Sequence, residues 1–317
     1  MKLYQNAAQI FVYCFVAIQS TLIAGQDKEL GQVDWLRNYD GAVEKSQSSG
    51  KPILILFQEV PGCAGCVQYG ETTLSHPLIV DAIEAEFVPL AIHNNAGGHD
   101  KEILKRFKEP AWNFQVMRFI DTEGNDLIER KDRVWTPRET AARMIEALEA
   151  AERRPPEYLR TVAWASAESE VKTAFFSMHC FWDGEAKLGA IEGVNETEAG
   201  WIDGHEVVRV VYGSKLIEWR SLVEQARAHG CAKQIYAPDA QTFAETPEQF
   251  GAFTDLYVNK SFRSARSSDQ KRHLQASKFR DLRLNSMQRT KINSALSLND
   301  TGMILKWLSP MQSKKFM

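Results

Sequence analysis

The sequence has little net charge and no long apolar run after its first 25 residues. Its 317 residues carry a formal charge of −3, with only a mildly basic stretch at 260–289. We therefore expect no nucleic acid as a partner, because nucleic-acid-binding surfaces concentrate positive charge. Hydrophobic residues make up 44% and charged residues 25% of the chain. This balance indicates a globular protein, and the length allows two domains.

The first 25 residues differ in composition from the rest of the chain. Lys2 is followed by an almost wholly apolar stretch over 10–23, and then by the small residues Ala24 and Gly25. This order is typical of a signal peptide, and the stretch is short for a membrane span. We expect residues 1–25 to be a signal peptide and the folded part to be exported, either periplasmic or secreted. An uncleaved membrane anchor is the alternative.

Cysteine is scarce, with five in the chain, of which Cys14 lies in the predicted signal peptide. Cys63 and Cys66 form a Cys-x-x-Cys pair, which closes too small a loop to stabilise a fold strongly. The sequence lacks a second such pair or histidines at zinc-ligand spacing, so we expect no metal and no other cofactor. Redox chemistry suits the pair, and an inert structural disulfide is the alternative.

The residues around this pair predict an α/β domain. The continuous apolar run at 53–57 is typical of a buried strand, and a helix is expected to begin at Cys63. A cysteine there meets the partial positive charge of the helix N-terminus, which favours its thiolate. Cys63 is therefore expected to attack, and Cys66, one turn further, to resolve. The pattern continues with a helix at 79–87, a strand at 88–93, a helix at 101–108, a hairpin at 116–130 and a helix at 136–153.

Residues 27–153 resemble the thioredoxin superfamily in this order of elements. The segment Val60-Pro61-Gly62-Cys63 resembles a subgroup in which Val-Pro-Gly precedes selenocysteine or cysteine. The resemblance implies a thioredoxin-like fold with a redox-active pair. The sequence departs from the superfamily at the usual cis-proline, whose place falls on Gln115.

The pattern after Arg154-Pro155-Pro156 predicts a linker at 154–169 and then an α+β domain. Strands are expected at 171–177, 194–199, 207–212 and 232–236, with helices at 182–191 and 215–229. This β-α-β-β-α-β order is ferredoxin-like. If the strands have the spatial order 4-1-3-2, Cys180, Trp201, Glu206 and Cys231 meet at one edge of the sheet. Residues 241–317 are expected to form a helical tail of unknown role.

Three short segments resemble peptide methionine sulfoxide reductase A, over about residues 170–240. Residues 179–185 resemble its Gly-Cys-Phe-Trp-Gly-x-Glu motif, residues 204–210 its Gly-His-Ala-Glu-Val-Val-Arg-Val, and residues 235–238 the strand that ends its core. The chain lacks the longer loop of that family before the second segment. It also lacks the family's Asp and Tyr before the last strand.

The resemblance implies roles for individual residues. Cys180 would be the nucleophile, Glu206 would assist proton transfer, and Phe181 with Trp182 would cradle the substrate methyl group. We add Trp201 to this pocket from its expected place at the sheet edge. Residue types alone leave core packing by Phe181 and Trp182 equally open.

The leading hypothesis is an exported, thiol-dependent oxidoreductase that reduces methionine sulfoxide. Cys180 would attack the sulfur and become a sulfenic acid, and Cys231 would condense with it to a disulfide. The pair Cys63–Cys66 would reduce that disulfide by exchange, and an external thiol reductant would then reduce the pair again. One alternative is a general oxidoreductase of protein disulfides with a degenerate second domain. The other is a non-catalytic module that binds methionine-rich or oxidised segments.

Overall fold

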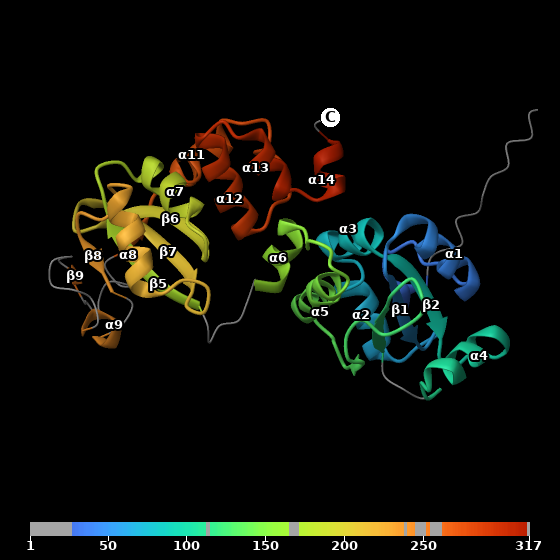
Figure 1. The fold of residues 1–317 in the computed structure, drawn as a ribbon. Coiled ribbons are helices and arrows are strands. Elements are labelled where there is room, and N and C mark those ends of the chain that lie inside the picture. Colours follow the sequence, from blue (N-terminus) through green and yellow to red (C-terminus); the bar gives the residue numbers. More distant parts are fainter. Residues whose placement is uncertain are drawn as a thin grey trace, which may run out of the picture.

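The computed structural model describes residues 27–111, 115–164, 171–237, 240–244, 252–253 and 262–315 (Figure 1). The predicted signal peptide lies outside these residues. Within them, no helix combines the length and the apolar character that crossing a bilayer requires.

The N-terminal domain is built on a four-stranded sheet in the order β2-β1-β3-β4. Its centre is β1 (Ile53–Gln58), which pairs in parallel with β2 (Val88–His93) and antiparallel with β3 (Val116–Ile120). Short β4 (Lys131–Asp132) completes the edge. Every residue of β1 is buried, because the side chains on its two faces pack into two separate hydrophobic cores. This confirms the predicted central strand.

Helices cover this sheet in the expected order. They are α1 (Tyr39–Ser49), α2 (Ala64–Thr72), α3 (Pro77–Glu86), α4 (Gly98–Phe107) and α5 (Pro137–Ala150). The predicted capping box starts α5, where Thr136 and Glu139 each accept a hydrogen bond from the other's backbone N–H. The domain has a thioredoxin-like fold. At the predicted cis-proline position, Gln115 is buried and its amide donates to the Val134 carbonyl at 2.6 Å.

Two local features differ from the sequence-based expectation. The hairpin is shorter than predicted, since residues 126–130 contribute a single bridge, Asp126 to Ile120, before β4. The predicted linker contains a helix, α6 (Glu157–Trp164). Its apolar side chains, including Leu159 and Val162, are buried in the N-terminal core. This apolar face attaches the first half of the expected linker to the first domain.

The second domain has the predicted β-α-β-β-α-β order. Its elements are β5 (Val171–Ser177), α7 (Phe181–Ala190), β6 (Val194–Ile202), β7 (His205–Gly213), α8 (Trp219–Ala228) and β8 (Ile235–Tyr236). The four strands lie in the order β6-β7-β5-β8 with antiparallel neighbours, which is the 4-1-3-2 order expected.

Two further strands come from the segment expected to be helical. β9 (Ala252–Phe253) pairs in parallel with β8, and β10 (Arg263–Ser264) pairs antiparallel with β6. Each is two residues long, which is too short for an alternating pattern to reveal. They form because the outer strands of a sheet present unpaired backbone groups that an extended segment can satisfy.

The rest of the tail is mainly helical. It contains α9 (Ala240–Ala244), α11 (Arg272–Gln275), α12 (Ser286–Ser297), α13 (Thr301–Lys306) and α14 (Pro310–Lys314). Helix α12 packs closely on α7, and Gly189 permits this approach, since a Cβ there would lie 2.6 Å from Ser294 Oγ. The Lys291 ammonium donates to the carbonyls of Gly189 and Ile191 at 2.8 Å each. Those bonds satisfy backbone groups at the end of α7.

A buried ion pair also fastens the tail to α7. Lys271 Nζ lies 2.5 Å from Glu185 Oε1, and the Lys271 backbone N–H donates to Glu185 Oε2 at 2.7 Å. The tail then returns to the first domain. The Asn285 amide donates to Thr161 Oγ1 at 2.8 Å, and the Met311 N–H donates to Asp81 Oδ2 at 3.3 Å. Figure 1 shows the tail helices running from α7 to α3.

Candidate functional site

Cys63 is the residue that precedes α2, at the end of the loop that follows β1. Three hydrogen bonds hold this loop. Asn95 accepts from the Val60 N–H at 3.1 Å and donates to the Pro61 carbonyl at 3.0 Å, and Glu29 accepts from the Gly62 N–H at 2.7 Å. The loop thus fixes the approach to the helix and leaves Cys63 exposed.

Gly62 is required by a close approach within this turn. A Cβ at this position would lie 2.4 Å from the Glu59 carbonyl oxygen and 2.7 Å from Cys66 Cβ. Any larger residue would therefore displace the backbone or the second cysteine.

The two sulfur atoms of Cys63 and Cys66 lie 3.4 Å apart, as free thiols in the structure. Hydrogen bonds from the Cys66 backbone N–H and the Cys66 thiol lower the pKa of Cys63 below its ordinary value. Cys66 is 3% exposed, and this burial raises the pKa of its thiol to about 11. One exposed thiol therefore ionises readily, and its buried neighbour stays protonated. This is the asymmetry that thiol–disulfide exchange requires.

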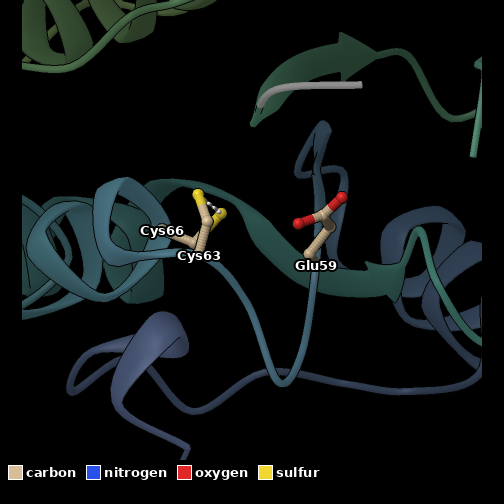
Figure 2. Close-up of side chains that lie close together, drawn as sticks. All are labelled: Glu59, Cys63 and Cys66. Carbon is tan, nitrogen blue, oxygen red and sulfur yellow. Dashed lines mark hydrogen bonds between the residues drawn. The ribbon is translucent and has the colours of Figure 1, made fainter. Parts of the chain in front are cut away.

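Glu59 lies beside this pair, as Figure 2 shows. One donor atom from each of Glu59, Cys63 and Cys66 lies within 4.8 Å of the others. The negative charge of Glu59 raises the pKa of both thiols, although this is a minor contribution at each. Within the ranges that the structure describes, no other group of three His, Cys, Asp or Glu side chains is gathered this closely.

The second cluster lies where β5 ends and α7 begins. Cys180 precedes the first residue of α7 and is partly exposed. The Glu206 carboxylate accepts a hydrogen bond from the Phe181 N–H at 2.7 Å, so it occupies the N-terminal end of the helix that Cys180 opens. The Glu206 carbonyl accepts from the Met178 N–H at 3.1 Å, which fixes the two strand ends together.

Aromatic side chains surround this helix start. Phe181 is 5% exposed and packs edge-to-face against Trp201, with ring centroids 5.4 Å apart. Trp201 is the register partner of Glu206 across β6 and β7. Trp182 is half-buried, and the Arg272 guanidinium of the tail lies 5.0 Å from the centre of its ring. Phe181 is therefore a core side chain, whereas Trp182 and Trp201 are partly accessible.

Cys231 lies in the loop between α8 and β8 and is 2% exposed. Burial raises the pKa of its thiol to about 11. The pKa of Lys187 in α7 is raised, mainly by Asp183, whose carboxylate lies 2.7 Å from the Lys187 ammonium. Cys231 and Cys180 both make smaller contributions to this rise, so Lys187 lies near both thiols. Cys180 follows β5 and Cys231 precedes β8, and these two strands are neighbours, so both cysteines lie at the same edge of the sheet, as the predicted topology requires.

The two clusters lie in different lobes of the molecule. Figure 1 places α2, which Cys63 precedes, in the N-terminal domain and α7, which Cys180 precedes, in the second domain, with α6 and the tail helices between them. The two sites therefore do not form one active centre in this arrangement.

Sequence reasoning missed two charged residues of these clusters, Glu59 and Lys187. Glu59 lies four residues before Cys63 in a loop, and only the folded turn brings it to the thiols. Lys187 lies in α7, shortly after the segment 179–185 that resembles the reductase motif. Its i,i+4 pairing with Asp183 looks like an ordinary surface ion pair.

Comparison with known proteins gives two partial sequence matches. A family model described as thioredoxin-like matches residues 34–138. A peptide methionine sulfoxide reductase from Methanococcus maripaludis is 33% identical over 73 residues, which cover 18% of this chain and 46% of that protein. The chain thus spans about half the length of this curated relative.

Two solved structures are also similar to part of the chain. One is titled a DsbH oxidoreductase; it is 20% identical, covers 42% of this chain and 94% of its own, and gives a TM-score of 0.33. The other is a thioredoxin from Thermus thermophilus, 20% identical, covering 37% of this chain and 85% of its own, with a TM-score of 0.27. The family match and the partial reductase similarity support a thiol-dependent redox function.

Proposed function

We propose that this protein reduces methionine sulfoxide at Cys180 and uses Cys63 and Cys66 to regenerate that site. The observation that carries the proposal is the Glu206 carboxylate at the Phe181 N–H, beside the partly exposed Cys180. A proton donor and a sulfur nucleophile then share one helix start, with Trp201 alongside. The reductase similarity supports the same assignment.

The first step transfers oxygen from substrate to enzyme. The Cys180 thiol gives its proton to the Glu206 carboxylate, the resulting thiolate forms a bond to the sulfoxide sulfur, and Glu206 passes the proton to the sulfoxide oxygen. The hydroxyl group then moves to the Cys180 sulfur, as the transient S–S bond and the substrate S–O bond break. The sulfide leaves with two added electrons, and Cys180 becomes a sulfenic acid. Trp182 and Trp201 supply accessible aromatic surface for the methyl group.

The second step releases water. The Cys231 sulfur attacks the Cys180 sulfenic acid, so that an S–S bond forms and hydroxide leaves as water with the Cys231 proton. Because Cys231 is buried, this step requires the segment after α8 to move toward Cys180.

The third step reduces the Cys180–Cys231 disulfide. Cys63 attacks it to give a mixed disulfide, and Cys66 then displaces the second-domain thiol and closes a Cys63–Cys66 disulfide. An external thiol reductant returns that pair to the dithiol. Since α2 and α7 lie in different lobes, the exchange requires either movement of one lobe or the meeting of two molecules.

The two routes differ in how the observed rate constant of this exchange depends on protein concentration. A rate constant that is independent of concentration indicates lobe movement within one chain, favoured by an effective concentration of about 1 mM. A rate proportional to concentration indicates transfer between molecules. The variant Cys66→Ser is expected to trap the mixed disulfide of Cys63 with Cys180 or Cys231, identifiable as a cross-linked peptide.

Export belongs to the same proposal, on the pattern of residues 1–25. It predicts that the mature protein begins near Gln26 outside the cytoplasm. N-terminal sequencing of the fractionated native protein tests this, and a full-length cytoplasmic product would contradict it.

A second candidate function is general reduction of protein disulfides by the N-terminal domain. It is favoured by the exposed Cys63 thiol with its lowered pKa. In that case oxidised methionine would not be a substrate, and reduction of insulin disulfides would depend on Cys63 and Cys66 and not on Cys180.

Turnover of a methyl sulfoxide with dithiothreitol as reductant separates the two candidates. Cys180→Ser is expected to abolish turnover, because serine cannot form the sulfenic acid. Cys63→Ser should retain it under the same conditions, since the small thiol bypasses the internal pair. Sulfoxide turnover that persists in Cys180→Ser would contradict the proposed function.

A further inference from the structure

We propose that Glu59, Cys63 and Cys66 form a binding site for a thiophilic divalent cation, with Zn²⁺ as the expected ion. The three donor atoms lie within 4.8 Å of one another, on a loop and the first turn of one helix. Figure 2 shows the two sulfur atoms together and the carboxylate facing them. The inference does not depend on the reaction proposed for Cys180.

The distances fit zinc after a small adjustment. Zinc binds thiolates at about 2.3 Å and carboxylate oxygens at about 2.0–2.2 Å, so tetrahedral ligand atoms lie roughly 3.5–3.8 Å apart. The two sulfur atoms are already 3.4 Å apart. The Glu59 carboxylate lies within 4.8 Å of both sulfur atoms and must come closer by up to about 1 Å, which rotation about its side-chain bonds allows.

The surroundings leave Glu59 available and hold its backbone. Among the residues that the structure describes, its carboxylate has no hydrogen-bond or ion-pair partner. The following residues Val60 and Pro61 are fastened to the Asn95 side chain. The donor is therefore placed by its loop rather than by a competing contact.

The charges of the site also favour a cation. As two thiolates and a carboxylate, the three side chains would carry three negative charges within a few ångströms of one another, and a cation placed among them relieves this repulsion. A bound divalent ion would offset two of these three negative charges. The donor set of two sulfur atoms and one oxygen matches ligands that zinc accepts, and three protein ligands leave the fourth position open toward solvent at Cys63.

Occupation of this site would change what the pair can do. Both thiolates would be ligands, so neither could attack a disulfide while the ion is bound. The metal-bound form would therefore be redox-silent until the ion is removed or competed away.

The experiment uses the reduced full-length protein titrated with Zn²⁺ against a chromophoric chelator, and with Co²⁺ followed by the thiolate-to-cobalt charge-transfer band. One ion per chain is expected, with no binding by protein whose Cys63–Cys66 pair is oxidised to a disulfide. Cys63→Ser should abolish the band. The double variant Cys180→Ser, Cys231→Ser should retain it, which assigns the ion to the first domain.

Glu59 is tested by Glu59→Gln, with Glu71→Gln as the matched control, since Glu71 is an exposed glutamate of α2. We expect Glu59→Gln to weaken zinc affinity about tenfold or more, the scale seen when residues that support a metal site are removed. Glu71→Gln should leave it unchanged. Equal affinity in Glu59→Gln and wild type, or zinc binding to the oxidised protein, would overturn the proposal. These results are independent of sulfoxide turnover, so failure of the proposed function would leave them standing.

Discussion

The Glu206 carboxylate lies 2.7 Å from the backbone nitrogen of Phe181 and accepts its hydrogen bond. This contact places a negative charge at the N-terminal end of α7, where the helix dipole and an unpaired N–H both favour it. In the proposed reaction the same carboxylate takes the proton of the Cys180 thiol and delivers it to the sulfoxide oxygen. A structural role and a chemical role therefore meet in one side chain, and substitution can separate them.

We predict that Glu206→Gln lowers sulfoxide turnover by about 10²–10⁴-fold, the usual contribution of a general acid. Its stability should change little, since the amide oxygen can still accept from Phe181. Turnover and urea unfolding are the two measurements. A loss of activity below about threefold would assign Glu206 to capping alone.

We predict that Cys231→Ser accumulates a sulfenic acid on Cys180 after one turnover. The reason is that no second thiol then remains at this edge of the sheet to condense with it, and the intermediate can be trapped with dimedone and located by mass spectrometry. Protein that keeps Cys231 but carries Cys63→Ser, so that the disulfide cannot be passed on, should give a Cys180–Cys231 disulfide instead. Equal dimedone labelling of the two proteins would show that Cys231 does not resolve the intermediate.

We predict that Cys63 is the first cysteine alkylated by iodoacetamide, and that Cys66→Ala slows the reaction at neutral pH. The Cys66 thiol helps to lower the pKa of Cys63, so its removal should shift the pH midpoint of alkylation upward. Cys66 and Cys231 should react only at high pH, because burial raises the pKa of each to about 11. A midpoint that is unchanged in Cys66→Ala would contradict this account of the pair.

We predict that Lys271→Met destabilises the protein by about 3–5 kcal/mol, because it leaves the Glu185 carboxylate buried without its counter-charge. Replacing both residues, as Glu185→Leu with Lys271→Met, should cost much less, because no unpaired charge then remains. Urea unfolding of the single and double variants measures the coupling. Additive effects would show that the two side chains stabilise the tail independently.

Much of the fold follows from local patterns. The apolar run at β1, the capping box of α5 and the short strand-forming segments of the second domain each predict their elements, because the physical signal is contained in a few neighbouring residues. The convergence of Trp201 and Glu206 follows from the strand order alone. Cys180 and Cys231 approach the same edge for the same reason.

The features that could not be predicted depend on distant partners. Helix α6 is stabilised by apolar residues that pack in the N-terminal core. The flanking Arg154-Pro155-Pro156 segment gives no indication of this packing. Strands β9 and β10 depend on sheet edges supplied by other segments. Glu185 looks like a motif residue in the sequence, and only the structure shows that its partner is Lys271, 86 positions later. No local pattern encodes such a pairing.

The return of the tail to the first domain has a consequence for synthesis on the ribosome. Asp81 and Thr161 accept hydrogen bonds from Met311 and Asn285, residues that are synthesised more than 100 positions later. The thioredoxin-like domain can fold as soon as its own elements are complete, since domains generally fold as units during translation. The places on α3 and α6 that the tail contacts must therefore remain uncovered until the tail has been made, and they are accessible to chaperones during that interval.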